Sequence, residues 1–295
     1  MTNLYTQSDL NIRKTWAYLS FFILLVAGIG WTISYFADSP IIFWIALIIA
    51  FSMSFFSYWF SDKMVLSMFK AKPVTREEMP ELFNIVQNLS ITAGLPMPQL
   101  YITEESQPNA FATGRNPDNA AIVVTRGLVN LLERVELEGV LAHELAHIGN
   151  RDILLSTIVV VLVGTISILT DTFFRASLGS RDRGGDGDEA KGRVLMMIVA
   201  VLLMILAPLV AQLIKLAISR KREYLADSTG SLLTRYPEGL ARALEKISRD
   251  QTPMTKANTA TAHLFINNPL KEGRINNLFS THPPIENRIA KLRGL

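Results

Sequence analysis

Long stretches without a charged residue limit what this chain can fold into more than any other feature of its sequence. A helix needs roughly 20 apolar residues to cross the hydrocarbon core of a bilayer, which is about 30 Å thick. Four stretches are long and apolar enough, at residues 16–36, 40–60, 153–170 and 194–214. The sequence therefore predicts a mainly α-helical integral membrane protein with four transmembrane helices in two hairpins.

The first stretch is not expected to be a cleaved signal peptide. It is longer than the apolar region of a typical signal peptide, and the second stretch follows it at once. We expect it to remain as an anchor.

Basic residues beside these stretches predict the orientation of the chain, because cytoplasmic flanks of transmembrane helices carry an excess of Lys and Arg. The flanking cations are Arg13 and Lys14 before the first stretch, Lys63, Lys70 and Lys72 after the second, and Arg220, Lys221 and Arg222 after the fourth. The loop between the first two stretches has neither residue type. Residues 62–152 and both termini are therefore expected in the cytoplasm.

The loop between the third and fourth stretches fits this topology poorly. Its sequence, RASLGSRDRGGDGDEAKGR, holds five basic residues and would face outward. Two interpretations stay open. Either the loop crosses the membrane as a solvated turn, or this pair of stretches lies at the membrane interface. In both, the flanking segments lie on the same side.

Charge and composition exclude several classes of function. The formal net charge is only +3, and the cations gather beside the apolar stretches, where topology accounts for them. Nucleic-acid binding is therefore not indicated. The chain has no cysteine, which excludes disulfides, thiolate metal sites and a cysteine nucleophile. Any metal must be held by His, Asp or Glu.

The segment after the second stretch predicts a helix and a small sheet. Thr75 and Glu78 form a capping-box pattern at the start of an amphipathic helix that ends near Gly94. The segments PQLYITE and NAAIVVTRG have the β-branched and aromatic content of strands. Between them, QPNAFATGRNPDN carries the Asn, Gly and Pro of turns.

Four further helices are predicted from periodicity and end signals. One runs from Leu128 to the Gly-Asn pair at 149–150, with its acids on the outer face at Glu133, Glu136 and Glu138. The others are KLAISRKREYLADSTGSLL, PEGLARALEKISRD, which begins at Pro237, and PPIENRIAKLRGL.

The predicted helix that ends at Gly149 contains His143-Glu144-x-x-His147 in a chain with four histidines. Positions four apart share a helix face, so both imidazoles can bind one ion while Glu144 handles the proton of a water. The neighbouring residues are apolar or small, which predicts a buried helix, and buried charge needs a partner. A catalytic zinc usually has three protein ligands and one open position.

The third ligand is sought on a helix that could lie alongside. REYLADSTG supplies Glu223 and, four residues later on the same face, Asp227. The first acid is placed to bind the metal and the second to accept a hydrogen bond from a ligating imidazole. A juxtamembrane charge cluster is the alternative interpretation.

Four motifs together give the chain a likeness to a known family: QPNAFATG, HELAHIGNRD, KREYLADSTG and THPPIENRI. It resembles the HtpX-type membrane zinc metalloproteases of bacteria, in family M48, relatives of the eukaryotic CAAX prenyl endopeptidases. The likeness covers nearly the whole chain. It implies a zincin-like protease domain with its active site on the cytosolic side of the inner membrane. It also implies a role in membrane protein quality control and stress response, and a tendency to self-cleavage.

The resemblance also implies roles for particular residues. By matching position, His143, His147 and Glu223 look like the ligands of one Zn²⁺ per chain, and Glu144 looks like the general base. Asp227 is similar to the acid that orients the first histidine from outside the ligand set.

Other positions are less sharply defined. His282 matches the family position that stabilises the oxyanion, whereas His263 has no assigned role. Asn109 and Ala110 resemble an edge strand that pairs with substrate backbone, although an ordinary turn explains them equally well. Arg288 pairs with a site carboxylate in similar enzymes, but it is equally an exposed residue of the last helix and is left out of the catalytic set.

The resulting division of the chain is a first membrane hairpin at 1–62, a cytosolic part with the HExxH helix at 63–152, a second hairpin at 153–216 and a cytosolic part with the third ligand at 217–295. The predicted function is a zinc-dependent endopeptidase that cleaves misfolded or membrane proteins at the cytoplasmic face. Its expected partners are polypeptide substrates and the lipid bilayer.

Two other functions stay open. A CAAX-type processing protease needs a lipidated substrate and a chamber walled by more than four helices. A membrane scaffold or transporter would hold a structural metal, but the apolar stretches carry almost no ionisable residue, which counts against transport.

Overall fold

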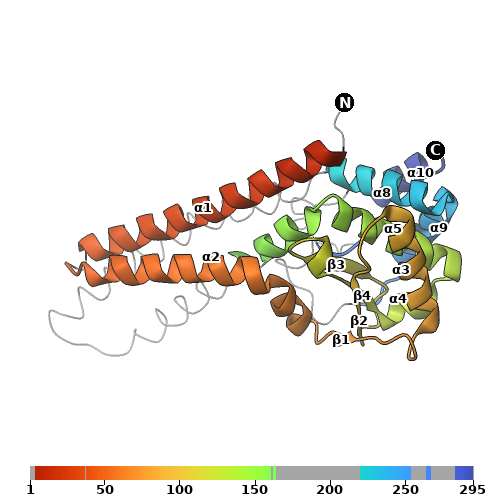
Figure 1. Cartoon of the computed structure of the whole chain (residues 1–295), viewed down its shortest axis with the longest axis horizontal. Coiled ribbons are helices and arrows are strands. Elements are labelled where there is room, and N and C mark those ends of the chain that lie inside the picture. Colours follow the sequence, from red (N-terminus) through yellow and green to blue (C-terminus); the bar gives the residue numbers. More distant parts are fainter. Residues whose placement is uncertain are drawn as a thin grey trace.

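The computed structural model describes residues 4–36, 38–160, 162–163, 220–253, 264–266 and 283–294. The predicted fourth stretch at 194–214, residues 161 and 164–170 of the third, and both His263 and His282 lie outside these residues. The described chain forms a long helical hairpin that projects from a body of helices and a small sheet (Figure 1).

Helices α1 (Leu4–Phe36) and α2 (Ile41–Met68) form the hairpin and contain the first two predicted transmembrane stretches. Each holds a window long and apolar enough to cross a membrane, Asp9–Phe36 and Ile41–Met68, and only 22% and 17% of these windows is buried inside the protein. Helices this apolar and this exposed are not core helices, so their side chains require an apolar surrounding such as a bilayer. Two of the four predicted spans therefore have this character in the part that the structure describes.

Residues 152–160, at the start of the predicted third stretch, are helical. They follow α5 (Arg134–Gly149) after Arg151, whose φ of 56° breaks the helical path. Leu154 and Ile158 pack in one cluster with Leu19 and Phe22 of α1. This segment therefore joins the hairpin to the body of the protein.

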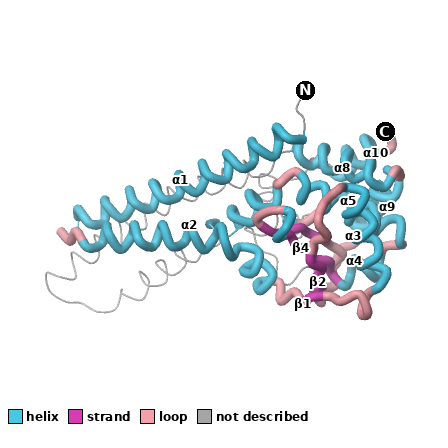
Figure 2. Tube along the Cα trace, in the orientation of Figure 1, coloured by secondary structure: helices cyan, strands magenta, loops and turns pink. Residues whose placement is uncertain are grey.

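The sheet has four strands in the order β1-β2-β4-β3 (Figure 2). The strands are β1 (Lys72–Pro73), β2 (Gln99–Thr103), β3 (Ala110–Gly114) and β4 (Ala120–Thr125). β2 and β4 are parallel, and β1 and β3 pair antiparallel at the two edges. The predictions of β2 and β4 are confirmed.

Strand β3 decides between the edge strand and the ordinary turn that the sequence leaves open for the segment QPNAFATGRNPDN, because Ala110–Gly114 form a strand. Two alanines and a glycine leave only Phe111 and Thr113 with the aromatic or β-branched character of a strand, yet all five residues are buried. Gly114 ends the strand at φ 138°, where a Cβ would collide with the backbone of Asn119. The turn residues belong to the short 3-10 helix η1 (Pro117–Asn119) that leads into β4.

The remaining helices pack mostly on α5 and on one another. They are α3 (Pro80–Ala93), α4 (Arg126–Leu131), α8 (Arg220–Thr234), α9 (Pro237–Arg249) and α10 (Ile285–Leu292). The predicted start of α9 at Pro237 is confirmed, and so is the presence of a last helix, α10. α3 ends at Gly94, in the left-handed conformation at φ 64°, as predicted. It begins at Pro80 instead of near Thr75, because the Thr75–Glu78 pattern closes a separate turn in which Thr75 N–H donates to the Glu78 carboxylate.

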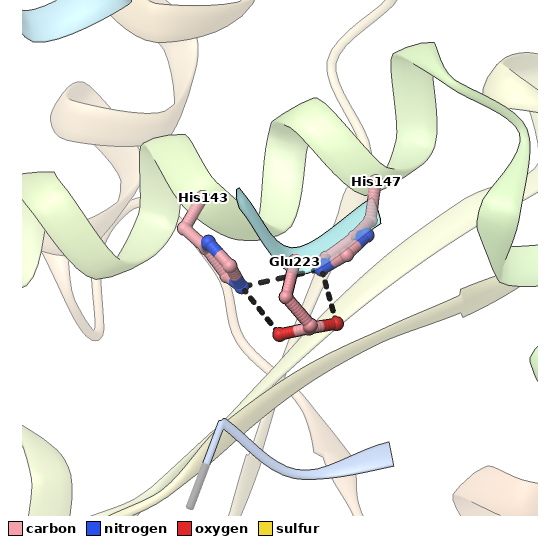
Figure 3. Close-up of side chains that lie close together, drawn as sticks. All are labelled: His143, His147 and Glu223. Carbon is pink, nitrogen blue, oxygen red and sulfur yellow. Dashed lines mark hydrogen bonds and ion pairs between the residues drawn. The ribbon is translucent and has the colours of Figure 1, made fainter. Parts of the chain in front are cut away.

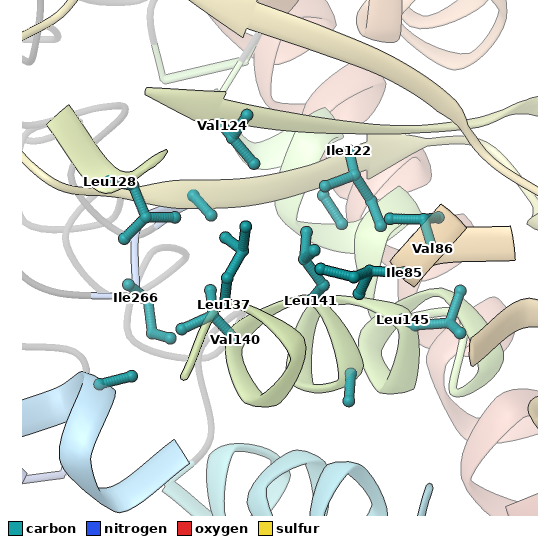
Figure 4. Close-up of a cluster of buried hydrophobic side chains, with 14 of the residues drawn as sticks. Ile85, Val86, Ile122, Val124, Leu128, Leu137, Val140, Leu141, Leu145 and Ile266 are labelled. Carbon is teal, nitrogen blue, oxygen red and sulfur yellow. The ribbon is translucent and has the colours of Figure 1, made fainter. Parts of the chain in front are cut away.

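Helix α5 lies at the centre of the body, and eleven of its residues are buried. Figure 4 shows Leu141 and Leu145 of α5 beneath Ile122 of β4, with Ile85 and Val86 of α3 beside them. α8 and α9 pack against other faces of the same helix. The His143-Glu144-x-x-His147 motif therefore lies on a helix that is surrounded by protein.

Two expectations about this region are wrong. The single helix predicted from Leu128 is divided into α4 and α5, because Glu133 adopts an extended conformation and caps α5 through a capping box with Glu136. Glu136 was expected on the outer face, but it is buried and forms an ion pair of 2.8 Å with Lys246 of α9. The helix that covers this face follows more than 80 residues later, so local periodicity does not reveal it.

Close packing of α5 on α9 gives a test of this arrangement. A Cβ added at Gly139 would lie 2.6 Å from the backbone nitrogen of Leu240. Overpacking typically costs about 1–3 kcal/mol and outweighs the roughly 1 kcal/mol that Ala gains over Gly in a helix. Gly139→Ala should therefore lower the melting temperature of the detergent-purified protein. Gly28→Ala in α1, where a Cβ meets nothing within 4 Å, is the matched control. Equal melting of wild type and Gly139→Ala would contradict this packing.

Candidate metal centre

Three side chains from two helices converge on one point. His143 and His147 lie one turn apart on α5, with their Nε2 atoms 3.2 Å from each other. Glu223 of α8 brings Oε2 to 3.8 Å from His143 Nε2 and Oε1 to 3.6 Å from His147 Nε2 (Figure 3). One donor atom from each residue lies within 4.8 Å of the others. These three residues could hold a metal ion.

Small residues allow the two helices to approach this closely. Gly230 of α8 lies against α5, where a Cβ would be 3.0 Å from the backbone nitrogen of His143. Ala226, one turn before it, is fully buried. The α8 face with Glu223, Ala226, Asp227 and Gly230 therefore meets the histidine face of α5.

The outer nitrogens of both histidines are held by carboxylates. His143 Nδ1 lies 2.9 Å from Asp227 Oδ1, and His147 Nδ1 lies 3.1 Å from Asp152 Oδ2. Such partners keep the proton on Nδ1 and leave the lone pair on Nε2. The two Nε2 lone pairs and the Glu223 carboxylate then face one another and repel, unless a cation lies between them. The donor set thus fits a metal ion.

The chemistry of the donors indicates which ions suit the site. Two imidazole nitrogens with one carboxylate oxygen are typical ligands of zinc in hydrolases. Mg²⁺ and Ca²⁺ prefer sites built from oxygen alone. Three protein ligands among the described residues leave room for a water, as a catalytic ion requires.

Glu144 lies beside the histidines and is almost completely buried. Burial raises the pKa of its carboxyl group, while the neighbouring imidazoles and a hydrogen bond from the backbone of Ala112 act in the opposite direction. The bond to Ala112 connects this carboxylate to strand β3. A buried acid whose pKa is raised is suited to proton transfer near neutral pH.

His147 combines burial with two acidic neighbours. Burial acts to lower its pKa, but the hydrogen bond with Asp152 and the charge of Glu223 outweigh this effect and raise the pKa to about 9. Without a metal, this imidazole therefore attracts a proton, which indicates how strongly the site favours positive charge.

Arg288 of α10 completes the group, which corrects its interpretation as an equally plausible exposed residue. Its side chain is fully buried and makes two bonds to Asp227, Nε to Oδ2 at 2.9 Å and an Nη to Oδ1 at 2.6 Å. Burial acts to raise the pKa of Asp227, but the Arg288 charge and the His143 bond lower it to about 2. One sequence signal pointed to Arg288: it falls on the apolar stripe of Ile285, Ile289 and Leu292.

Asp152 was not among the predicted site residues. It follows α5 directly and was assigned only to the end of the cytosolic part. In the structure it is buried, binds His147, and is also contacted by Asn11 of α1 and Arg222 of α8. It is the last residue of the motif HELAHIGNRD, which was the signal that could have identified it.

Asn109 and Ala110 lie at the start of β3, an edge strand of the sheet among the described residues. Asn109 exchanges hydrogen bonds with Thr125. The Ala110 carbonyl accepts a long bond of 3.4 Å from Ile266 N–H on the side away from β4. His282 lies outside the described residues.

Two comparisons with known proteins point to the same family. The model of Peptidase family M48 matches residues 76–295. A "Protease HtpX homolog" of Dictyoglomus thermophilum is 47% identical over 98% of this chain and 94% of its own length. One from Syntrophobacter fumaroxidans is 51% identical over 85% of this chain and 89% of its own.

A solved structure shows a similar fold. Ste24p of S. mikatae aligns with a TM-score of 0.51 at 22% sequence identity, over 95% of this chain and 66% of that one. At this identity the likeness concerns the fold alone.

Removal of Glu223 tests the donor set. Glu223→Ala leaves two imidazoles, so zinc per chain after dialysis should fall well below the roughly one ion expected of the wild type. Elemental analysis of the purified protein measures it. Glu104→Ala, at an exposed acid after β2, is the control and should keep the wild-type content. An unchanged content in Glu223→Ala would mean that another residue completes the site.

Removal of Arg288 tests the buried ion pair. Arg288→Ala leaves Asp227 buried without its guanidinium, which should reduce the free energy of unfolding by about 3–5 kcal/mol. Since the pKa of Asp227 is lowered to about 2, this loss should be complete above pH 4 and shrink as the pH falls toward 2. Thermal melting at several pH values measures it, with Arg242→Ala on the surface of α9 as control. Identical melting of Arg288→Ala and wild type at pH 7 would contradict the pair.

Proposed function

This chain belongs to peptidase family M48 and is a metallopeptidase, and we propose that it is a membrane-bound zinc endopeptidase acting at the cytoplasmic face of the bacterial inner membrane. The observation that supports this most directly is the convergence of His143, His147 and Glu223 within 4.8 Å, with Glu144 beside them. Polypeptides are its substrates, and we propose that misfolded and membrane proteins are among them.

In the proposed reaction, His143, His147 and Glu223 hold one zinc ion per chain, which supplies Lewis acidity toward the peptide carbonyl and toward water. Glu144 accepts a proton from the attacking water and delivers it to the leaving amide nitrogen. Burial makes its carboxylate a stronger base than an exposed one. No covalent bond between enzyme and substrate is required.

Other residues orient these groups. Asp227, fixed by Arg288, keeps the proton of His143 on Nδ1. We propose, from the resemblance of its motif, that His282 stabilises the developing oxyanion. The four segments 1–62, 63–152, 153–216 and 217–295 remain the proposed division between membrane hairpins and cytosolic parts.

The substrate is proposed to lie extended along strand β3, beginning at Asn109 and Ala110. Edge strands bind extended peptides by adding a strand to the sheet. The bond from Ala112 N–H to Glu144 supports this place, because it puts the proposed base directly beside the strand. A peptide aligned there would bring its carbonyl close to the ion.

A position near the membrane is supported by α1. Its candidate span begins at Asp9, and Asn11 contacts Asp152, which contacts the ligand His147. The proposed active site therefore lies two residue contacts away from the start of a membrane helix. Loops of membrane proteins would reach it more easily than distant soluble chains.

Of the two alternative functions, one is excluded and the other requires its own assay. A non-enzymatic scaffold is excluded by the family assignment. A CAAX-type processing activity calls for a direct assay, in which cleavage of a farnesylated peptide in preference to its unmodified form would replace the broader endopeptidase proposal.

Substitution of the base tests the mechanism. Glu144→Gln preserves the shape of the side chain and the three ligands, so zinc content should stay at the wild-type level. Hydrolysis of casein, and of the chain itself, should fall roughly 10²–10⁴-fold because proton transfer is lost. Glu138→Gln, on a half-buried position of the same helix, should keep full activity. Casein cleavage by Glu144→Gln near the wild-type rate would show that another group is the base.

A further inference from the structure

A buried side chain of the first membrane helix touches the carboxylate that holds a metal ligand. Asn11 of α1 is 1% exposed, and its Nδ2 donates to Asp152 Oδ1 at 2.6 Å and to the Asn150 carbonyl at 3.1 Å. Asp152 in turn binds His147 Nδ1 through its other oxygen, Oδ2, at 3.1 Å. The chain of contacts runs from the membrane helix to the imidazole in two steps.

The chemistry of these contacts fixes the orientation of the amide. Both neighbours of the amide group of Asn11 are acceptors, one a carbonyl and one a carboxylate, so only the nitrogen end can face them. The carbonyl of Asn150 lies at the C-terminal end of α5, where the helix carries partial negative charge. Asn11 therefore supplies donors at a point where two negative groups meet.

Asp152 Oδ1 has a short and a long contact among the described residues. Asn11 lies at 2.6 Å, whereas the guanidinium of Arg222 lies at 3.4 Å. Without Asn11, the carboxylate would retain a long contact on one oxygen and the imidazole on the other. Its rotation, and with it the direction of the His147 ring, would be less restricted.

From this geometry we propose that Asn11 is a positioning residue of the metal centre. Through its hydrogen bond to Asp152 it fixes the orientation of the His147 ring. The position of the first membrane helix therefore affects the affinity of the site for the ion. The inference rests on the proposed function, in that His147 is taken as a zinc ligand. The inference adds Asn11 to the residues that act on the metal centre. Asn11 precedes residues 76–295, the part of the chain that matches the model of the family.

The simpler interpretation is that Asn11 only attaches α1 to the body of the protein. Both interpretations predict some loss of stability on substitution. They differ at the metal, because mere attachment leaves the ligand geometry unchanged, whereas a positioning residue alters the affinity and the ligand field of the ion. Partners of a ligating histidine typically contribute 10–100-fold to metal affinity.

The test uses the full-length protein in detergent. Asn11→Leu has a similar size and no donor, and it should release zinc to a chromophoric chelator 10–100-fold faster than wild type and change the visible spectrum of the Co²⁺-substituted protein. Ser34→Ala is the matched control. It removes a part-buried hydroxyl bond at the other end of α1, far along the chain from Asp152, and should match wild type in both measurements.

A double substitution separates positioning from attachment. Asp152→Asn should also weaken zinc retention, and Asn11→Leu added to it should produce little further change, because both act through one contact. Zinc release and a Co²⁺ spectrum like wild type in Asn11→Leu, or effects of the two substitutions that simply add, would overturn the inference. If Asn11→Leu does not fold, Asn11→Ala is measured in its place, with the same outcomes.

The outcomes distinguish this inference from the proposed function. A wild type that holds zinc and cleaves casein, together with an Asn11→Leu protein that retains zinc equally well, refutes only the role of Asn11. A wild type that retains no zinc refutes the proposed function, and the role of Asn11 with it.

Discussion

Buried negative charge around helix α5 is the constraint on which the rest of the structure depends. Four carboxylates, those of Glu144, Asp152, Glu223 and Asp227, are each at most 5% exposed. Isolated buried charge is strongly unfavourable, so compensating cations must be brought to them. The guanidinium groups of Arg222 and Arg288 supply two positive charges. A metal cation held by His143, His147 and Glu223 would add further compensating charge.

This requirement explains why elements distant in sequence meet at α5. α8 contributes Glu223, Asp227 and Arg222 through a face of small residues, and α10 contributes Arg288 from its apolar stripe. α1 adds the amide of Asn11. Each element therefore brings a charged or hydrogen-bonding group that pairs with a group on a neighbouring element. The apolar contacts around α5 hold these elements in place. The residues of the candidate metal centre are thus held in place by the same contacts that form the core around α5.

Sequence reasoning succeeded where the determining interactions are local. The histidine spacing, the end of α3 at Gly94 and the strands β2 and β4 all follow from residues within a few positions of one another. It also brought Glu223 and Asp227 to the histidines, because the chain offers few acids at helical spacing outside the surface helices. It missed Asp152 and the buried state of Glu136, whose partners Asn11 and Lys246 lie 141 and 110 positions away along the chain. Secondary-structure propensity and hydrophobic periodicity depend on nearby residues only, so they do not predict contacts with such distant segments.

The separation of the ligands along the chain has a consequence for biosynthesis. The ribosome completes the histidine helix long before the acid that joins it, and Arg288 follows His143 by 145 residues. A nascent chain in which α8 is still untranslated therefore has only two of the three side chains that could hold the ion. The complete group forms only after helices from distant parts of the chain have packed together.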